Sequence, residues 1–206
     1  MYLAVEGVYY DADSGPGSDF MGAVYAATLL GDWGNGLEAR YQILKSTNAD
    51  FTQWDIVEED TLVAPGMLSL DTFYDIRVEY AGSNNFTFTA NGSSMSATGP
   101  TRSGPADSDY QSLGAYIEDG SDPVSIAGRF DDVFVNDGST AYDDFSGSRL
   151  DPDRWFYDPT RFTVLGGFDL EEVRGVENDK LRLGIRGVDL RDTHPVRTRL
   201  VLTEPV

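Results

Sequence analysis

The sequence contains no cysteine and only one histidine among its 206 residues. Without cysteine there are no disulfide bonds, thiolate zinc sites or cysteine nucleophiles, so packing has to stabilise the fold. His194 stands in the polar segment RDTHPVR, and a lone histidine cannot form a multi-histidine metal site. Since no G-x-S-x-G motif supplies a serine for it to activate, we expect no triad hydrolase.

Long apolar runs are absent as well. No stretch approaches the roughly 18 apolar residues of a membrane span. The N-terminus lacks a basic segment leading into an apolar one, as a secretion signal would have. If the protein is exported, we expect its signal to lie outside this sequence.

Basic residues are scarce. Fifteen lysines and arginines face 35 aspartates and glutamates, which gives a formal net charge of −20. Such a charge repels phosphate backbones and anionic lipid headgroups over a Debye length of about 8 to 10 Å. We therefore expect neither a nucleic-acid partner nor membrane insertion, whereas divalent cations such as calcium are natural counterions.

What the sequence has in abundance is alternation of apolar and polar residues with a period of two. In the segment Phe73 to Tyr80, the side chains of Tyr74, Ile76, Val78 and Tyr80 are expected on one face. No segment sustains the i, i+3, i+4, i+7 apolar pattern of a helix. Glycine, asparagine, aspartate and proline separate the alternating segments, as is typical of turns.

These segments recur along the whole chain and predict about ten to twelve strands. After Phe86 to Ala90, the pair Asn91-Gly92 is a type I′ hairpin signal. The spacing predicts an all-β fold, either a sandwich or a barrel, and not a parallel α/β sheet. The other expected strands are Leu3 to Tyr10, Ala23 to Leu30, Leu37 to Ile43, Gln53 to Glu58, Ser112 to Ile117, Arg129 to Val135, Arg161 to Leu165, Leu181 to Ile185 and Val196 to Leu202.

Several blocks resemble the laminin G-like branch of the concanavalin A-like lectin/glucanase superfamily. They are YDDFSGSRLDPDRW (142–155), ENDKLRLGIRG (177–187), GNGLEARYQI (34–43), TFYDIRVEYAGSNNFTFTANG (72–92) and GRFDDVFVN (128–136). The resemblance implies a two-sheet antiparallel β-sandwich of the jelly-roll type in a secreted or cell-surface protein. It implies no single activity, because such folds carry many functions.

The order of these blocks differs from that of the family. There the DDF…LD…W block is the first strand and the FDDV block the last, whereas here they adjoin around residue 138. The resemblance therefore implies a single permuted domain over residues 1–206. The alternative is a tandem in which residues 1–136 finish one module and residues 141–206 start the next. Because the joined order is short by about one strand, its open edge would favour strand exchange between chains, giving a homo-oligomer or filament.

Catalytic carboxylates are not expected. Laminarinase-like enzymes of this superfamily carry E-x-D-x-E or E-x-D-x-x-E on one strand, and neither pattern occurs here. The adjacent pairs Glu58-Glu59 and Glu171-Glu172 would point to opposite faces of a strand, which does not suit a paired-carboxylate mechanism. A glycoside hydrolase is therefore the least favoured interpretation.

Sugar binding requires flat apolar rings beside hydrogen-bonding carboxylates and amides. The segment GDWGNG (31–36) supplies Asp32, Trp33 and Asn35 in one loop. Tyr9, Tyr10, Tyr41 and Trp54 are expected to line an adjacent sheet face, although aromatic residues at alternating strand positions commonly belong to a core instead. Trp155 is expected to be core packing.

Calcium has two candidate sites, and the second, Asp11, Asp13 and Asp19, lacks the Glu at the twelfth position and the Gly of an EF-hand loop. The aspartates Asp131, Asp132, Asp143 and Asp144 lie on two segments expected to be antiparallel neighbours. Carboxylates this close repel one another unless a cation or an arginine lies among them. The resemblance also implies a structural calcium near these termini, whereas the alternative partners are Arg129, Arg149 and Arg154.

Together these features favour a non-catalytic, extracellular carbohydrate-binding or adhesion module, with calcium as a candidate structural cofactor. The alternative is a structural subunit of an extracellular assembly built by strand exchange. The expected partner is accordingly a glycan in the first case and a second copy of the chain in the other.

Overall fold

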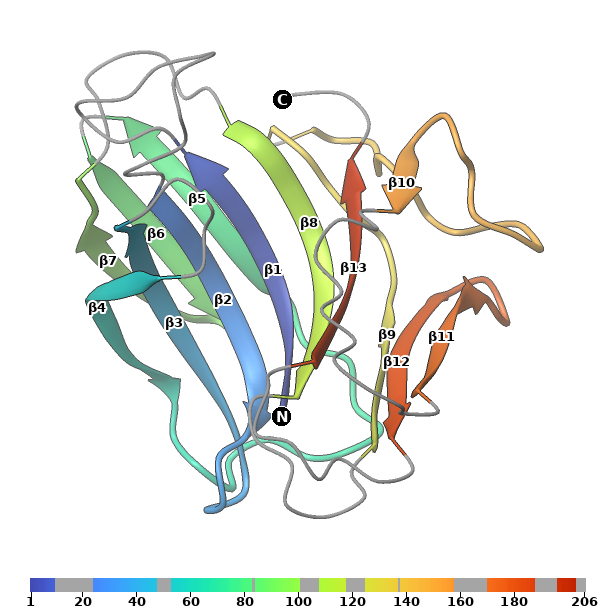
Figure 1. Cartoon of the computed structure of the whole chain (residues 1–206), viewed down its shortest axis with the longest axis horizontal. Helices are drawn as coiled ribbons and strands as arrows, with labels where there is room; N and C mark the ends of the chain where they lie inside the picture. The colour runs from blue at the N-terminus through green and yellow to red at the C-terminus, as the bar shows by residue number, and fades with distance from the viewer. Residues whose placement is uncertain are drawn as a thin grey trace. The chain divides into compact units, whose positions relative to one another are not determined.

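The computed structural model describes residues 1–9, 24–47, 53–82, 84–100, 108–117, 125–136, 138–157, 170–187 and 196–202. Within this part of the chain the protein is all-β, with antiparallel pairing and no helix, as the sequence predicts (Figure 1). Four features considered from the sequence lie outside the described residues: Tyr10, the aspartates Asp11, Asp13 and Asp19, the expected strand Arg161 to Leu165, and His194.

The described residues form thirteen strands. They are β1 (Tyr2–Tyr9), β2 (Val24–Asp32), β3 (Leu37–Ser46), β4 (Trp54–Val63), β5 (Ile76–Gly82), β6 (Asn85–Ala90), β7 (Ser93–Thr98), β8 (Ser108–Ile117), β9 (Ser125–Phe130), β10 (Trp155–Tyr157), β11 (Leu170–Val176), β12 (Leu181–Gly187) and β13 (Val196–Leu202). The expected strands do not include β10 and β11, and β7 was indicated only through the hairpin signal at Asn91-Gly92.

The chain divides into two compact units, and the division passes through β1 and β8. The 4–112 unit contains most of the first half of the chain, and the 113–204 unit contains the second half together with residues 1–3. The segments on either side of residue 138 belong to the same unit. The permuted and tandem organisations expected from the sequence both stay predictions.

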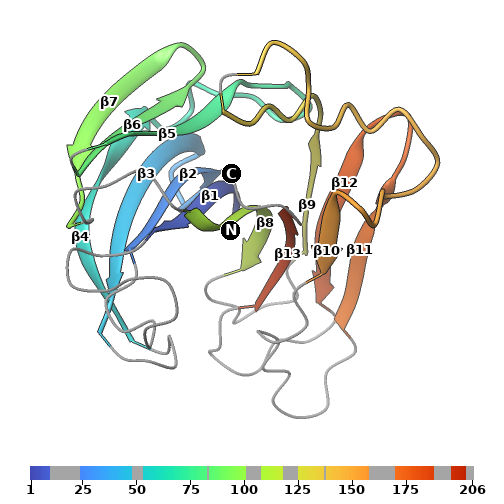
Figure 2. The ribbon, with the colours of Figure 1, turned by 90° about the horizontal axis from the view of Figure 1, so that it is seen from above.

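In the 4–112 unit the strands follow the order β8-β1-β2-β3-β4 in one sheet and β5-β6-β7 in another. Figure 2 shows β5, β6 and β7 along one side of β2, β3 and β4. The pairing of β3 with β4 is interrupted between Ala39 and Arg40 and again between Ile43 and Leu44. Each interruption inserts an extra β4 residue, as β-bulges do.

Side chains from both sheets of this unit build one hydrophobic core. Phe86 and Phe88 of β6 are completely buried, and Phe88 stacks on Tyr41 of β3 with ring centroids 4.7 Å apart. Burial of each such side chain contributes about 1.5 to 3 kcal/mol. The face predicted for the Phe73 to Tyr80 segment is confirmed, because its four alternating side chains pack against this core.

The β6–β7 hairpin is also confirmed. Ala90 pairs with Ser93 across a two-residue turn. The turn residues Asn91 and Gly92 have φ angles of 48° and 77°, and a type I′ turn requires positive φ at both positions. Asparagine and glycine adopt this geometry at least cost, so the local sequence fixes the hairpin register.

In the 113–204 unit the strand orders are β10-β13-β8 and β11-β12-β9. The central strand β12 pairs with β11 on one side and with β9 on the other, both antiparallel. Its alternating side chains Leu181, Leu183 and Ile185 are buried. These residues therefore form the buried side of the central strand in the β11-β12-β9 sheet.

The strand predicted over Arg129 to Val135 is partly wrong. β9 ends at Phe130, and beyond it the described residues on either side of position 138 pair through one isolated antiparallel bridge, Val133 with Asp143. Positive φ angles at Asp132 (43°) and Asn136 (53°) interrupt the extended backbone that a longer strand needs. The expected proximity of the segments is thus confirmed, but not an extended hairpin.

Candidate ligand-binding face

The sheet formed by β1 to β4 has a second face, opposite the core of the 4–112 unit. Because Tyr41 and Ile43 point into the core, alternation places Arg40 and Gln42 of β3 on this second face. Tyr25 of β2 lies opposite Leu44 of β3 and so shares this face. On β4, Trp54 lies opposite Ser46 and Glu59 lies opposite Gln42, so both residues belong to it as well. We call it the polar face and define it by Glu6, Tyr25, Trp33, Glu38, Arg40, Gln42, Trp54, Glu59 and Ser112.

A buried carboxylate organises one part of the polar face. Glu6 of β1 is only 3% exposed, and each of its two oxygens accepts a hydroxyl hydrogen bond. Tyr25 Oη donates to Oε2 at 2.5 Å, and Ser112 Oγ donates to Oε1 at 2.6 Å. These bonds offset the cost of burying a carboxylate. Tyr25 is thereby fixed with its ring edge toward Trp54, at a centroid distance of 6.2 Å.

A second buried carboxylate organises the other part. Glu38 is 1% exposed and accepts a 2.7 Å bond from Arg40 Nη2. The Arg40 guanidinium carbon lies 4.5 Å from the centroid of the Trp33 ring, a cation–π contact. Within the described residues, Arg40 Nε is buried and has no hydrogen-bond partner. Glu38 therefore fixes the position of the Arg40 guanidinium, which in turn packs over one face of the Trp33 indole.

The turn that carries Trp33 is stabilised by its own aspartate. Asp32 Oδ1 accepts hydrogen bonds from Gly34 N at 2.6 Å and from Gly36 N at 3.2 Å. Gly34 and Gly36 have φ angles of 101° and 102°, which residues with a Cβ rarely adopt. This oxygen of Asp32 thus shapes the turn, and Asn35 lies exposed at its tip.

The residues predicted to bind sugar separate into two groups. Trp33 and Trp54 are partly exposed and belong to the polar face. Tyr41, by contrast, lies on the core face, is 2% exposed and donates its hydroxyl to Glu58 Oε1 at 2.9 Å. Burial, followed by the hydrogen bond and charge of Glu58, raises the pKa of Tyr41 to about 12. Tyr41 therefore packs in the core and offers no ring to a ligand. The expectation for Tyr9 is wrong for the same reason, because Tyr9 is 7% exposed and belongs to the same core.

Glu6, Glu38, Arg40 and Ser112 were not among the candidates from the sequence. Alternation separates Glu38 and Arg40 from Tyr41 on the strand, yet it does not indicate which face a second sheet covers or that the carboxylate is buried. No local motif marks Glu6 or Ser112, which are 106 residues apart and meet only through the sheet. Their assignment required the strand order.

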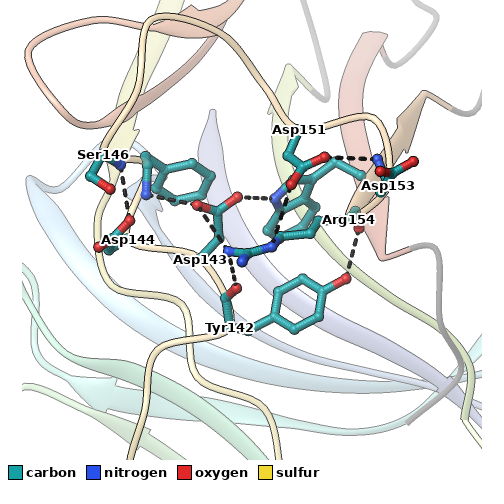
Figure 3. Close-up of polar contacts among 9 residues, drawn as sticks. Tyr142, Asp143, Asp144, Ser146, Asp151, Asp153 and Arg154 are labelled. Atoms are coloured by element: carbon teal, nitrogen blue, oxygen red, sulfur yellow. Dashed lines mark hydrogen bonds and ion pairs between the residues drawn. The ribbon is translucent and has the colours of Figure 1, made fainter.

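Two of the candidate calcium ligands lie together in a compact hydrogen-bonded cluster (Figure 3). Asp143 is 7% exposed and accepts bonds from Trp155 Nε1 at 2.6 Å and from Phe145 N at 2.8 Å. Asp144 is exposed and accepts a 3.0 Å bond from Ser146 N. Hydrogen bonding to Ser146 lowers the pKa of Asp144 below its usual value.

The four candidate ligands do not converge. Asp131 pairs with Lys180, whereas Asp132 is exposed on a left-handed backbone. Arg154 Nη1 lies 3.8 Å from Asp143 Oδ1, so one of the alternative arginine partners is present. In the described ranges no three acidic or histidine side chains gather as a metal site would require. Calcium binding at these aspartates stays a prediction.

Comparisons of the chain with protein-family models, with curated proteins and with solved structures found no match. The likeness to the concanavalin A-like superfamily accordingly stays a prediction. Over the described part of the chain, no helix has the length and apolar character needed to cross a membrane.

Proposed function

We propose that this chain is a non-catalytic, extracellular carbohydrate-binding or adhesion module with a jelly-roll sandwich fold, and that it holds a glycan on its polar face. The observation that carries this proposal is the placement of Trp33 and Trp54, both partly exposed, on one sheet face with hydrogen-bonding side chains. Indoles stack on the apolar faces of pyranose rings, whose hydroxyls need donors and acceptors nearby.

On the polar face, buried groups fix the positions of their neighbours, and accessible groups bind the ligand. Glu6 and Glu38 are buried, and they fix Tyr25 and Arg40 by charge-assisted hydrogen bonds. Accessible groups then meet the ligand. Gln42 Nε2 donates to Glu59 Oε2 at 3.2 Å, and this pair presents amide and carboxylate oxygens on the same face. Such pre-positioning lowers the entropy that a ligand would lose on binding.

The test is retention on a glycan array, for the unmodified chain and for Trp33→Ala and Trp54→Ala. We expect each substitution to lower retention at least about tenfold, since each removes a stacking platform worth about 1.4 kcal/mol or more. Melting temperatures should change little, because neither indole belongs to the buried core. Phe134→Ala is the control, because Phe134 is 55% exposed and lies outside the polar face.

A second arm repeats the array with a chelator. Loss of retention with chelator would support the calcium hypothesis, whereas unchanged retention would separate glycan binding from calcium. If Trp33→Ala and Trp54→Ala retain glycans as the unmodified chain does, or if no glycan is retained at all, the proposed function is wrong.

A further inference from the structure

The loop between β4 and β5 exposes an unusual amount of apolar surface. We call residues 64–75 the apolar loop. Within it Met67 is 72% exposed, Leu70 is 81% exposed and Phe73 is 55% exposed. Single exposed apolar residues are normal, but three large ones within seven positions form a group that soluble proteins keep mainly for interactions.

Several contacts hold the apolar loop in one conformation. Leu68 is buried in the core of the 4–112 unit and anchors the loop from inside. Gly66 N donates to Leu37 O at 3.0 Å, and Ser69 N donates to Tyr74 Oη at 2.7 Å. The exposed side chains are thus presented on an ordered backbone, which reduces the entropy lost when a partner binds.

The charges of the apolar loop are all of one sign. Asp71 and Asp75 are exposed, and residues 64–75 contain no lysine or arginine. The chain as a whole carries a net charge of −20. A partner that approaches this loop closely must therefore offer positive charge around its apolar contact, since complementary potentials speed association and like charges oppose it.

The size of the apolar group argues against a stable dimer of this chain. Stable interfaces use about 20 to 30 residues on each side, whereas a few well-placed aromatic and aliphatic residues serve as a hot spot inside a pocket. Two copies that each carry −20 would also repel one another at low salt. Anionic membranes are disfavoured for the same reason.

We propose that the apolar loop is a docking site for a second protein, with Leu70 and Phe73 entering an apolar pocket that is bordered by lysine or arginine. The site differs from the polar face, and the proposal does not depend on glycan binding. Trp33→Ala should therefore leave this docking unchanged.

The first step of the test selects peptides from a random phage-displayed library on the immobilised full chain. We expect the enriched peptides to combine aliphatic or aromatic residues with lysine or arginine. The most enriched peptide is then synthesised and its Kd is measured by fluorescence anisotropy. The double substitution Leu70→Ser with Phe73→Ser should weaken binding at least about tenfold. Raising the salt concentration from about 0.05 to about 0.5 M should also weaken it.

The matched control is Phe134→Ser, because Phe134 is also 55% exposed but lies outside the apolar loop. It should leave the Kd unchanged, and circular dichroism should show that all variants are folded. The proposal is wrong if no peptide is enriched, or if the enriched peptides bind the double variant as well as the unmodified chain. It is also wrong if the double substitution instead abolishes self-association in light scattering or co-sedimentation with phosphatidylcholine vesicles.

Discussion

At the scale of single residues, Asp143 shows how one buried carboxylate can secure an irregular segment. The segment from Tyr142 to Trp155 has almost no regular pairing, so its backbone groups depend on side chains and turns. Asp143 satisfies a backbone N–H of Phe145 and the indole N–H of Trp155 at once. Trp155 in turn contacts Tyr142 and Phe145 through its ring. The cluster replaces the strand pairing that the sequence predicted.

This role predicts a stability effect. Asp143→Ala should lower the free energy of unfolding by about 2 to 4 kcal/mol, because it leaves two buried N–H donors without an acceptor. Trp155→Phe removes only one donor. In a double-mutant cycle by urea denaturation, the two substitutions should show a coupling energy of about 1 to 2 kcal/mol. A coupling energy near zero would mean that the 2.6 Å contact contributes nothing to stability.

At the scale of elements, the sheet β11-β12-β9 depends on a close approach between two strands. Gly184 of β12 pairs with Ala127 of β9. A Cβ at position 184 would lie 2.7 Å from Ile126 O and 3.1 Å from Ala127 Cβ. The first contact is with backbone, which cannot move aside without disturbing the strand pairing. Glycine is therefore required here by space and not by its dihedral freedom.

Gly184→Ala should consequently destabilise the chain by about 1 to 3 kcal/mol through overpacking. The matched control is Gly175→Ala in the neighbouring strand β11, where an added Cβ would meet nothing within 4 Å. That substitution should be neutral or slightly stabilising, because alanine restricts the unfolded chain. Thermal unfolding of both variants provides the comparison. Equal melting temperatures would show that β12 and β9 lie further apart than described.

At the scale of the whole molecule, stability depends on how every ionisable group titrates in the folded and unfolded states. Two tyrosines of the 4–112 core stand out. Burial, followed by the charge of Tyr80, raises the pKa of Tyr9 to about 12, and the pKa of Tyr41 is likewise about 12, against an ordinary value of 10.0. Both must stay protonated inside the fold. Their contribution to stability is complete below pH 10 and is lost as the pH rises from 10 to about 12.

The free energy of unfolding should therefore fall between pH 10 and pH 12, by up to about 1.4 kcal/mol per pH unit for each tyrosine. Tyr41→Phe removes one of these groups. At pH 8 the variant should be less stable by about 1 kcal/mol, since the hydrogen bond to Glu58 is lost. At higher pH the difference should shrink or reverse. Urea denaturation at several pH values measures this, and a constant difference would contradict the raised pKa.

Local sequence patterns predicted much of the fold but little of the candidate site. The inward-facing residues of β5 followed from alternation, and the β6–β7 turn followed from Asn91-Gly92, because both depend on neighbours in sequence. The aromatic pair Trp33 and Trp54 was among the candidates, although Tyr41 was placed with them. Alternation states that two faces exist but not which one a second sheet covers.

What the sequence determined by itself is the period of two, the turn chemistry, the charge of −20 and the absence of cysteine. Only the tertiary structure decided that Tyr41 supports the core, that Glu6 and Glu38 are buried beneath accessible neighbours, and that Asp143 binds Trp155. The physical reason is distance along the chain. Burial and hydrogen-bond partners are set by strand order, and strand order joins residues such as Glu6 and Ser112 that no local pattern connects.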